Sequence, residues 1–174
     1  SGLGHGIAAY GLSNANISHN DIDYEDTYAG FVGIDVNGGA ITIEGNRIAN
    51  IPWYVTQTPY TAIFLLSTLP NTYRIMNNMI SNIAPSANGI HINGSDVAIY
   101  HNTVVLADPT SGQHTALLLG SQSNIDVRNN IFFTSHRIIH SVYEITNATF
   151  DHNLLFSPPF SIQSAGVNYN SLLD

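Results

Sequence analysis

The sequence predicts an all-β solenoid, a fold in which short strands stack coil upon coil. An Asn returns six times, each time three residues after one apolar residue and two residues before another: Asn20, Asn46, Asn78, Asn102, Asn130 and Asn153. Successive Asn residues are separated by 26, 32, 24, 28 and 23 residues, which is one period with insertions of varying length. A second series of strand-like runs precedes each Asn, at 6–9, 33–36, 62–65, 89–92, 116–119 and 139–142. Two series in phase indicate one unit repeated over about six coils.

Within each repeat, the apolar positions on either side of the Asn predict two short strands with one face in the core. These positions hold Ile17, Ile43, Ile75, Ile99, Val127 and Phe150 before the Asn, and Ile22, Ile48, Ile80, Val104, Phe132 and Leu155 after it. Stacking at roughly 4.8 Å per coil brings like residues over like, so the Asn side chains are expected to bond to one another at a corner. Asn also tolerates the left-handed conformation that a sharp corner requires. We therefore interpret the Asn column as structural.

Composition limits the classes of function. The 174 residues fit one domain, and the formal net charge of -8, with four arginines and no lysine, is opposite to that of a nucleic-acid binder. The chain has no Cys, which excludes disulfides and thiol catalysis. No apolar run approaches the roughly 20 residues of a membrane span. Only 9% of the residues are charged, so helices are expected to be scarce.

The Asn-bearing turns resemble those of the right-handed parallel β-helix proteins of the pectin-lyase-like superfamily, over roughly residues 6–155. The resemblance implies coils of three short parallel strands. Residues 167–173 are similar to a Tyr-x-Ser-Leu segment of secreted bacterial members, which implies an extracellular or cell-surface location. Gly4-His5-Gly6 copies a tripeptide of polygalacturonases, but the paired aspartates and the Arg-Ile-Lys of that family are missing. No specific enzyme family is therefore matched, and His5 is expected in a turn.

The domain prediction is a parallel β-helix over 1–156 and a C-terminal segment over 157–174, which folds over the last coil or leads out of it. Uncovered end coils offer unpaired backbone to other strands, and neither end of the sequence shows an amphipathic capping helix. We therefore expect a fragment of a longer protein, or further coils of another subunit at the exposed ends.

Insertions after the Asn are expected along one edge of the stack, where loops carry function. They contain Tyr24, Asp26, Tyr28, Trp53 and Tyr54. Aromatic rings stack on the apolar faces of sugars and carboxylates bind their hydroxyls, so these residues predict a polysaccharide-binding groove. The alternative is that the rings only pack the insertions against the stack.

Candidate catalytic residues lie on the same edge. Asp108 and His136 both follow a corner Asn by six residues in neighbouring coils, so regular stacking would bring them together. A His beside a carboxylate is suited to act as a general base, and Arg137 to hold an anionic sugar group. An ordinary surface contact between His136 and Asp108 is the alternative.

No cofactor is implied by the sequence except calcium, for which the acidic run at 21–26 offers oxygen ligands. In the alternative interpretation Asp21 pairs with Arg47, which shares its column, as Arg128 does with Asp151. The histidines are not expected to bind zinc. Those before a corner Asn lie in coils that are not all neighbours, and His91 and His140 fall on the outward side of the other strand series, where solvated side chains are expected.

Two functions remain open at this point. The first is an extracellular carbohydrate-associated β-helix, part of a polysaccharide hydrolase or lyase. The second is a non-catalytic structural or adhesive solenoid of a cell surface, filament or phage spike. Fold analogy does not choose between them, because activity belongs to sites.

Overall fold

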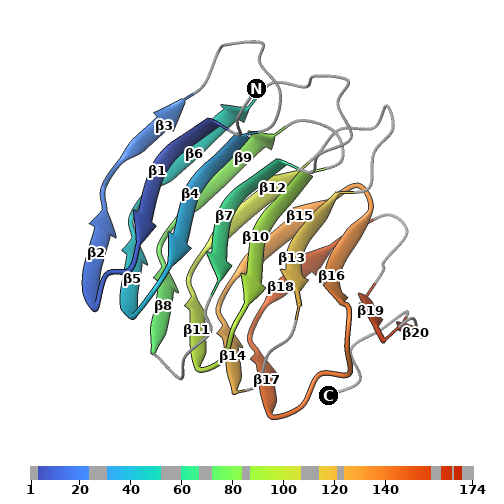
Figure 1. Cartoon of the computed structure of the whole chain (residues 1–174). Coiled ribbons are helices and arrows are strands. Elements are labelled where there is room, and N and C mark those ends of the chain that lie inside the picture. Colours follow the sequence, from blue (N-terminus) through green and yellow to red (C-terminus); the bar gives the residue numbers. More distant parts are fainter. Residues whose placement is uncertain are drawn as a thin grey trace.

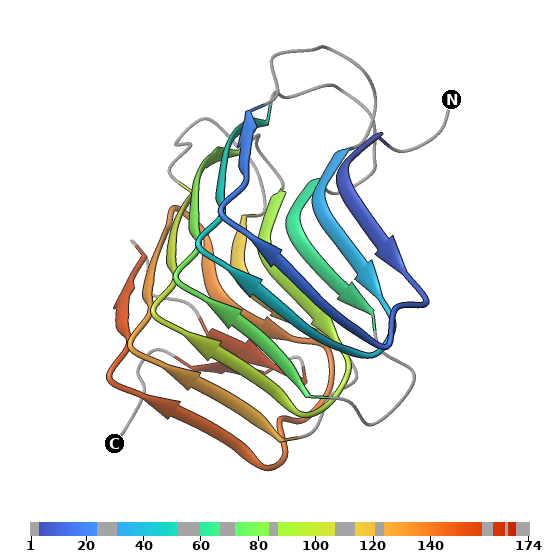
Figure 2. The same cartoon turned by 90° about the vertical axis from the view of Figure 1, so that its left-hand side faces the viewer.

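The computed structural model describes residues 4–23, 31–51, 60–66, 72–83, 87–106, 114–120, 124–157, 162–165 and 167–169. Every regular element among them is a β-strand, and these strands form three sheets that wrap around one core. The colours in Figure 1 run evenly from the blue N-terminal coil to the red C-terminal coil, so successive turns of chain lie side by side. Figure 2 shows the coils from the N-terminal end, with three strand directions per coil. The predicted parallel β-solenoid is confirmed.

Each coil contributes one strand to each sheet, and all neighbouring strands except the last pair are parallel. Sheet A, in front in Figure 1, contains β1 (Gly4–Tyr10), β4 (Phe31–Asn37), β7 (Tyr60–Leu66), β10 (Ala87–Asn93), β13 (Thr115–Leu119), β16 (Arg137–Ser141), β19 (Ile162–Ser164) and β20 (Val167–Tyr169). Sheet B contains β2 (Asn14–Ser18), β5 (Ala40–Glu44), β8 (Tyr73–Met76), β11 (Val97–Tyr100), β14 (Ile125–Arg128) and β17 (Ala148–Asp151). Sheet C contains β3 (Asp21–Asp23), β6 (Arg47–Ile51), β9 (Met79–Ile83), β12 (Thr103–Leu106), β15 (Ile131–Thr134) and β18 (Leu154–Phe156).

The core consists of stacked aliphatic columns, as the alternation predicts. In sheet A, Ile34, Ile63 and Ile90 are partners in register and have no exposed surface. The two columns beside the Asn are equally buried in the middle coils, whereas Phe150 and Leu155 of the last coil are only partly buried. Burial of a full Ile side chain stabilises the fold by about 1.5–3 kcal/mol, so the central coils hold the stack together.

Sheet A bends at a column of small residues, which contains Gly or Ala in the first five coils. A Cβ on Gly33 would lie 2.6 Å from the carbonyl oxygen of Ala62 and 3.0 Å from Cγ2 of Ile48. This column therefore points into the core, next to the inward column that begins with Ile7. Two consecutive inward positions require a bend in each strand, which makes the outer face of sheet A concave.

The Asn column lies at the corner between sheets B and C and forms a continuous ladder. Each Asn from Asn20 to Asn130 donates both its backbone N–H and its side-chain amide to Oδ1 of the next Asn, at 2.8–3.0 Å. The four central members are 1% exposed. Because buried amides need partners, the ladder satisfies polar groups that would otherwise destabilise the corner.

The left-handed conformation expected at the column Asn occurs one residue earlier. The residues with positive φ at this corner are His19, Gly45, Asn77, His101, Asn129 and His152. At four of the six positions the residue is Gly or His, and its backbone makes the sharp turn while the following Asn makes the ladder bonds.

The predicted ladder ion pairs are half correct. Arg47 Nη1 contacts Asp21 Oδ1 at 2.5 Å and Asp23 Oδ2 at 3.4 Å, as the shared column predicts. Arg128 is in register with Asp151, but its Nε contacts Asp126 Oδ1 at 2.6 Å. Asp126 lies two residues earlier on the same outward face of the same strand, so it reaches the guanidinium without crossing to another coil.

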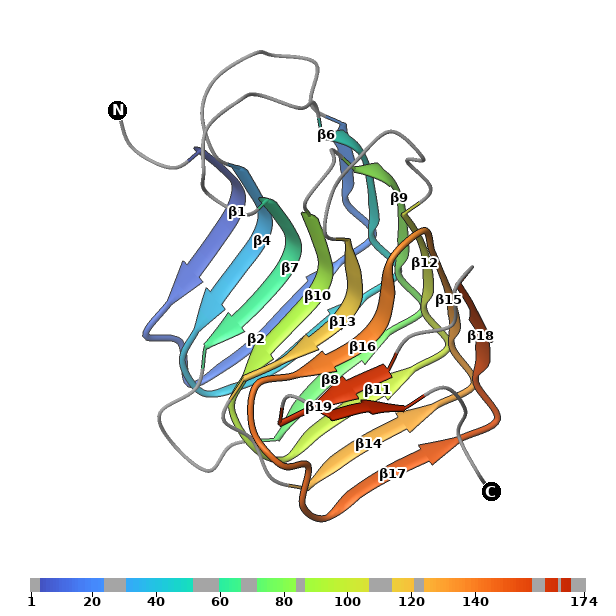
Figure 3. The ribbon, with the colours of Figure 1, turned by 90° about the vertical axis from the view of Figure 1, so that its right-hand side faces the viewer.

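Beyond the sixth coil, β19 adds to sheet A next to β16, and β20 turns back antiparallel to β19. Figure 3 shows this hairpin at the C-terminal end of the stack. The division of the chain at residue 157 stays a prediction.

Candidate functional site

The outer face of sheet A is concave and brings side chains of different register positions together. His5 is aligned with Val32, and Asp35 is aligned with Ala8, three residues further along β1. In a straight strand, residues three apart point to opposite faces and lie about 10 Å from each other. Here His5 Nδ1 lies 3.1 Å from Asp35 Oδ2. The bend therefore creates a crease along the outside of sheet A.

Asp35 is the centre of a polar cluster at the N-terminal end of this crease. Asp35 is only 8% exposed. Its Oδ2 accepts a hydrogen bond of 2.5 Å from the hydroxyl of Tyr10 and also contacts Nδ1 of His5. The hydrogen bond to Asp35 raises the pKa of Tyr10 to about 12, with smaller contributions from burial and from the negative charge of Asp35. Tyr10 therefore keeps its proton and orients the carboxylate.

The cluster defines the tautomer of His5. An imidazole whose Nδ1–H points at a carboxylate presents the lone pair of Nε2 on the other side of the ring. The rings of His5 and Tyr10 are perpendicular, with centroids 6.4 Å apart. The sequence places His5 in a turn, but the structure places it within β1.

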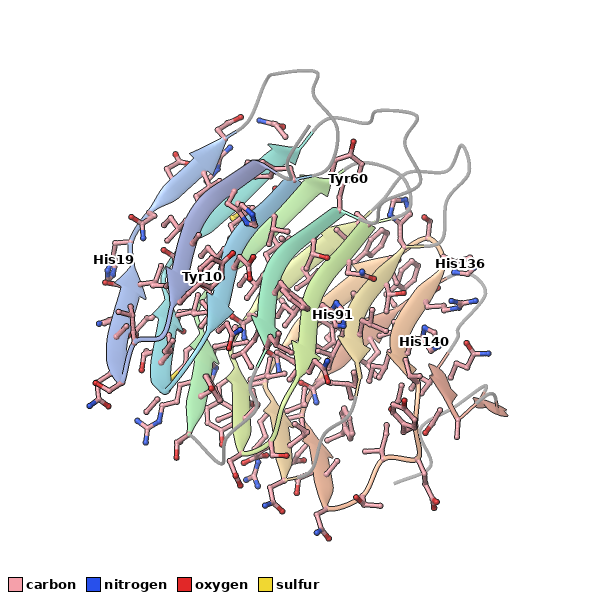
Figure 4. The ribbon with its side chains drawn as sticks, viewed as in Figure 1. Tyr10, His19, Tyr60, His91, His136 and His140 are labelled. Atoms are coloured by element: carbon pink, nitrogen blue, oxygen red, sulfur yellow. The ribbon has the colours of Figure 1, made fainter. Side chains whose placement is uncertain are left out.

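A column of large side chains, three of them rings, continues from Asp35 along the crease. Asp35, Phe64, His91, Leu118 and His140 are successive partners in register on sheet A. The rings of Phe64 and His91 have centroids 4.8 Å apart. Figure 4 shows His91 and His140 on the same face of the sheet. The crease thus offers aromatic surface over several coils.

His91 and His140 are not the solvated residues that the sequence predicts. Burial lowers the pKa of His91 to about 4. Burial, and then the charge of Arg137, lower the pKa of His140. Both histidines are half-buried because the concave face packs its side chains against one another.

The structure describes two of the three predicted catalytic residues, Arg137 and His136. Arg137 begins β16 and continues the outward column that starts at His5, so it lies on the outer face of sheet A at the opposite end. His136 is in the turn before β16, and its pKa is lowered by burial and by Arg137. Its Nδ1 is buried without a hydrogen-bond partner among the described residues. Asp108 lies outside the described residues, so its contact with His136 stays a prediction.

The predicted sugar-binding residues Tyr24, Asp26, Tyr28, Trp53 and Tyr54 also lie outside the described residues. Calcium binding at the acidic run stays a prediction. Within the described ranges, no three His, Cys, Asp or Glu side chains are grouped so that they would hold a metal ion. Nor do these ranges contain a helix of the length and apolarity needed to cross a membrane.

The central residue of the site, Asp35, is one that sequence reasoning missed. The sequence feature that could have revealed it is an Asp between two apolar strand residues, Ile34 and Val36, which are both fully buried. A carboxylate in such a strand must either be exposed or have hydrogen-bond donors. Its partners lie one coil away, at non-equivalent positions.

The chain matched no family model, no curated protein and no solved structure. What is established is the fold, a parallel β-solenoid with an asparagine ladder. The relationship to the pectin-lyase-like superfamily stays a prediction.

Proposed function

We propose that this protein is an extracellular carbohydrate-associated β-helix that binds a linear glycan along the crease of sheet A. In this proposal, His5 acts on the glycan as a general base positioned by Asp35. The contact between His5 and the buried carboxylate of Asp35 carries the proposal, because it joins a proton acceptor to an orienting group on a concave face. The rings of Phe64 and His91 supply stacking surface for sugars.

The reaction class is hydrolysis or elimination: His5 takes a proton from water or from the carbon beside a uronic-acid carboxylate, the glycosidic C–O bond breaks, and the protonated imidazole returns the proton to the departing oxygen. Asp108, His136 and Arg137 are a second proposed catalytic group. Arg137 lies at the start of β16 on the outer face of sheet A, and a guanidinium there suits an anionic sugar.

A polysaccharide screen tests the proposal. The longest natural form of the protein is incubated with neutral and uronic-acid polysaccharides, with and without calcium, and reducing ends and unsaturated products are followed. We expect His5→Gln and Asp35→Asn each to lower kcat at least about a hundredfold, the lower end of general-base effects. His136→Ala tests the second group.

The matched control is His19→Asn. His19 is an exposed corner histidine outside sheet A, and Asn occupies the same left-handed position in two other coils. Its turnover should equal that of the unmodified protein. Turnover that survives in both His5→Gln and Asp35→Asn would remove this pair from the mechanism, and glycan binding without any turnover would overturn the enzyme proposal.

A second candidate function is a non-catalytic solenoid that associates with a neighbouring copy. The outer face of sheet C favours it, because Met79, Ile131, Leu154 and Phe156 are 42–63% exposed there. The ring of Phe133 stacks on the ring of Phe156, with their centroids 4.8 Å apart. Exposed apolar patches of this kind commonly mark contacts between proteins.

This candidate predicts a self-association that depends on sheet C. In sedimentation velocity, the unmodified protein should show a concentration-dependent shift to a dimer, and Ile131→Asn should weaken that shift about tenfold because it places an amide in the apolar contact. A monomer at all concentrations contradicts the candidate.

A further inference from the structure

A polar pocket on the outer face of sheet B is separate from the crease of sheet A. It has a volume of about 580 Å³ and is lined by side chains of the first three coils, including Asn14, Asn16, Thr42, Thr72 and Arg74. Asn16, Thr42 and Arg74 are successive partners in register on β2, β5 and β8. An amide, a hydroxyl and a guanidinium therefore stand in one row at the roughly 4.8 Å spacing of strands.

Arg74 differs from Arg47 and Arg128 because it makes no ion pair with any residue in the described ranges. Arg47 contacts Asp21 and Asp23, and Arg128 contacts Asp126. Among the described residues, no carboxylate lies within ion-pair distance of Arg74. In a chain with twelve carboxylates and a net charge of -8, the guanidinium of Arg74 at this pocket is thus without a carboxylate partner in the described part of the chain.

The acidic residues next to Arg74 on its two sides, Glu44 of β5 and Asp96 directly before β11, are each hydrogen-bonded to an Asn. Asp96 Oδ1 accepts from Asn124 Nδ2 at 2.9 Å. Glu44 lies two residues after Thr42 on β5, and its Oε1 accepts a hydrogen bond of 3.3 Å from Asn77 Nδ2. The donors around Arg74 are neutral amides and hydroxyls. These groups bind ligand hydroxyls without adding a charge that would compete for the guanidinium.

We propose that this pocket binds an oxyanion carried by a hydroxyl-rich ligand, such as a sugar acid, a sugar sulfate or a sugar phosphate. The guanidinium forms two parallel hydrogen bonds with the planar or tetrahedral oxyanion, a geometry for which Arg is suited. Asn14, Asn16 and Thr42 bond to the hydroxyls of the same ligand. The site is independent of the crease of sheet A and of any catalysis there.

An NMR titration of the full chain tests the site. Glucuronate, glucose 6-sulfate and glucose 6-phosphate are added separately, with glucose as the neutral probe, and amide shifts of coils one to three are followed. We expect saturable shifts at Asn16, Thr42 and Arg74 with at least one charged sugar and none with glucose. The three charged probes distinguish a carboxylate, a sulfate and a phosphate.

Two variants identify the residues that bind. Arg74→Gln should weaken the binding of the charged sugar about tenfold or more, because it removes the charge from an exposed strand position that tolerates Gln. Thr42→Val should weaken it less. The control Arg128→Gln removes an arginine of the same sheet face that is already paired with Asp126, so it should leave the affinity unchanged.

Three results would overturn the proposal: no saturable shift with any charged sugar, equal shifts with glucose, or unchanged affinity in Arg74→Gln. Asp35→Asn should not alter this titration. The pocket on sheet B and the proposed function of sheet A can therefore fail separately.

Discussion

Asn102→Ala is expected to destabilise the fold by roughly 3–5 kcal/mol, because it interrupts the ladder at its centre. The side chain of Asn102 donates to the carbonyl of Ile75 at 2.8 Å, and its Oδ1 accepts from the backbone and side-chain nitrogens of Asn78 at 3.0 Å each. Ala removes the acceptor of the buried Asn78 backbone N–H and the side-chain donor to Ile75, and it leaves the Asn78 side-chain amide with its bond to the carbonyl of Ile43 alone. Each buried hydrogen-bonding group left unsatisfied costs about 1–3 kcal/mol. Urea unfolding measures the loss as a lower midpoint at unchanged slope.

The end of the ladder provides a matched control. Asn20 is half-exposed and donates to Asn46 and to the carbonyl of Ser18, but no described residue donates to its Oδ1. Asn20→Ala should therefore cost only about 1 kcal/mol. Equal losses for the central and the terminal substitution would show that the ladder does not act through buried, unsatisfied groups.

The sequence was sufficient to predict the stack, because stacking gives equivalent positions of successive coils the same environment. Ile43, Ile75 and Ile99 face one core column, and Asn46, Asn78 and Asn102 face one corner, so the same residue type returns. The ladder ion pair of Asp21 with Arg47 followed from the same equivalence.

The contact between His5 and Asp35 could not be predicted by comparing equivalent positions of successive coils. His5 and Asp35 meet across three register positions, and their contact depends on the bend at the column of Gly33 and Ala62. The bend has a sequence signal, a small residue at the same place in five coils, but its effect on the outer face appears only in three dimensions. The predicted catalytic contact with Asp108 and the sugar-binding insertions lie outside the described residues.

The crease also makes the fold sensitive to acid through His91. Burial lowers the pKa of His91 to about 4 in the folded protein, whereas an unfolded His titrates near 6.5. A group with a depressed pKa binds fewer protons when folded, so acid favours unfolding. The stability is fully present above pH 6.5 and is lost as the pH falls toward 4, by about 2 kcal/mol after allowance for partial exposure.

His91→Leu isolates this contribution. Leu suits the position, because Leu118 occupies the next place in the same column and the ring of Phe64 packs on the other side. The free energy of unfolding, measured in urea between pH 7 and pH 4, should fall about 2 kcal/mol less in His91→Leu than in the unmodified protein. Carboxylates titrate in both proteins, so their effect cancels in the difference. Parallel pH profiles would mean that His91 is hydrated and charged in the folded crease, and the crease would then be open to water along its length.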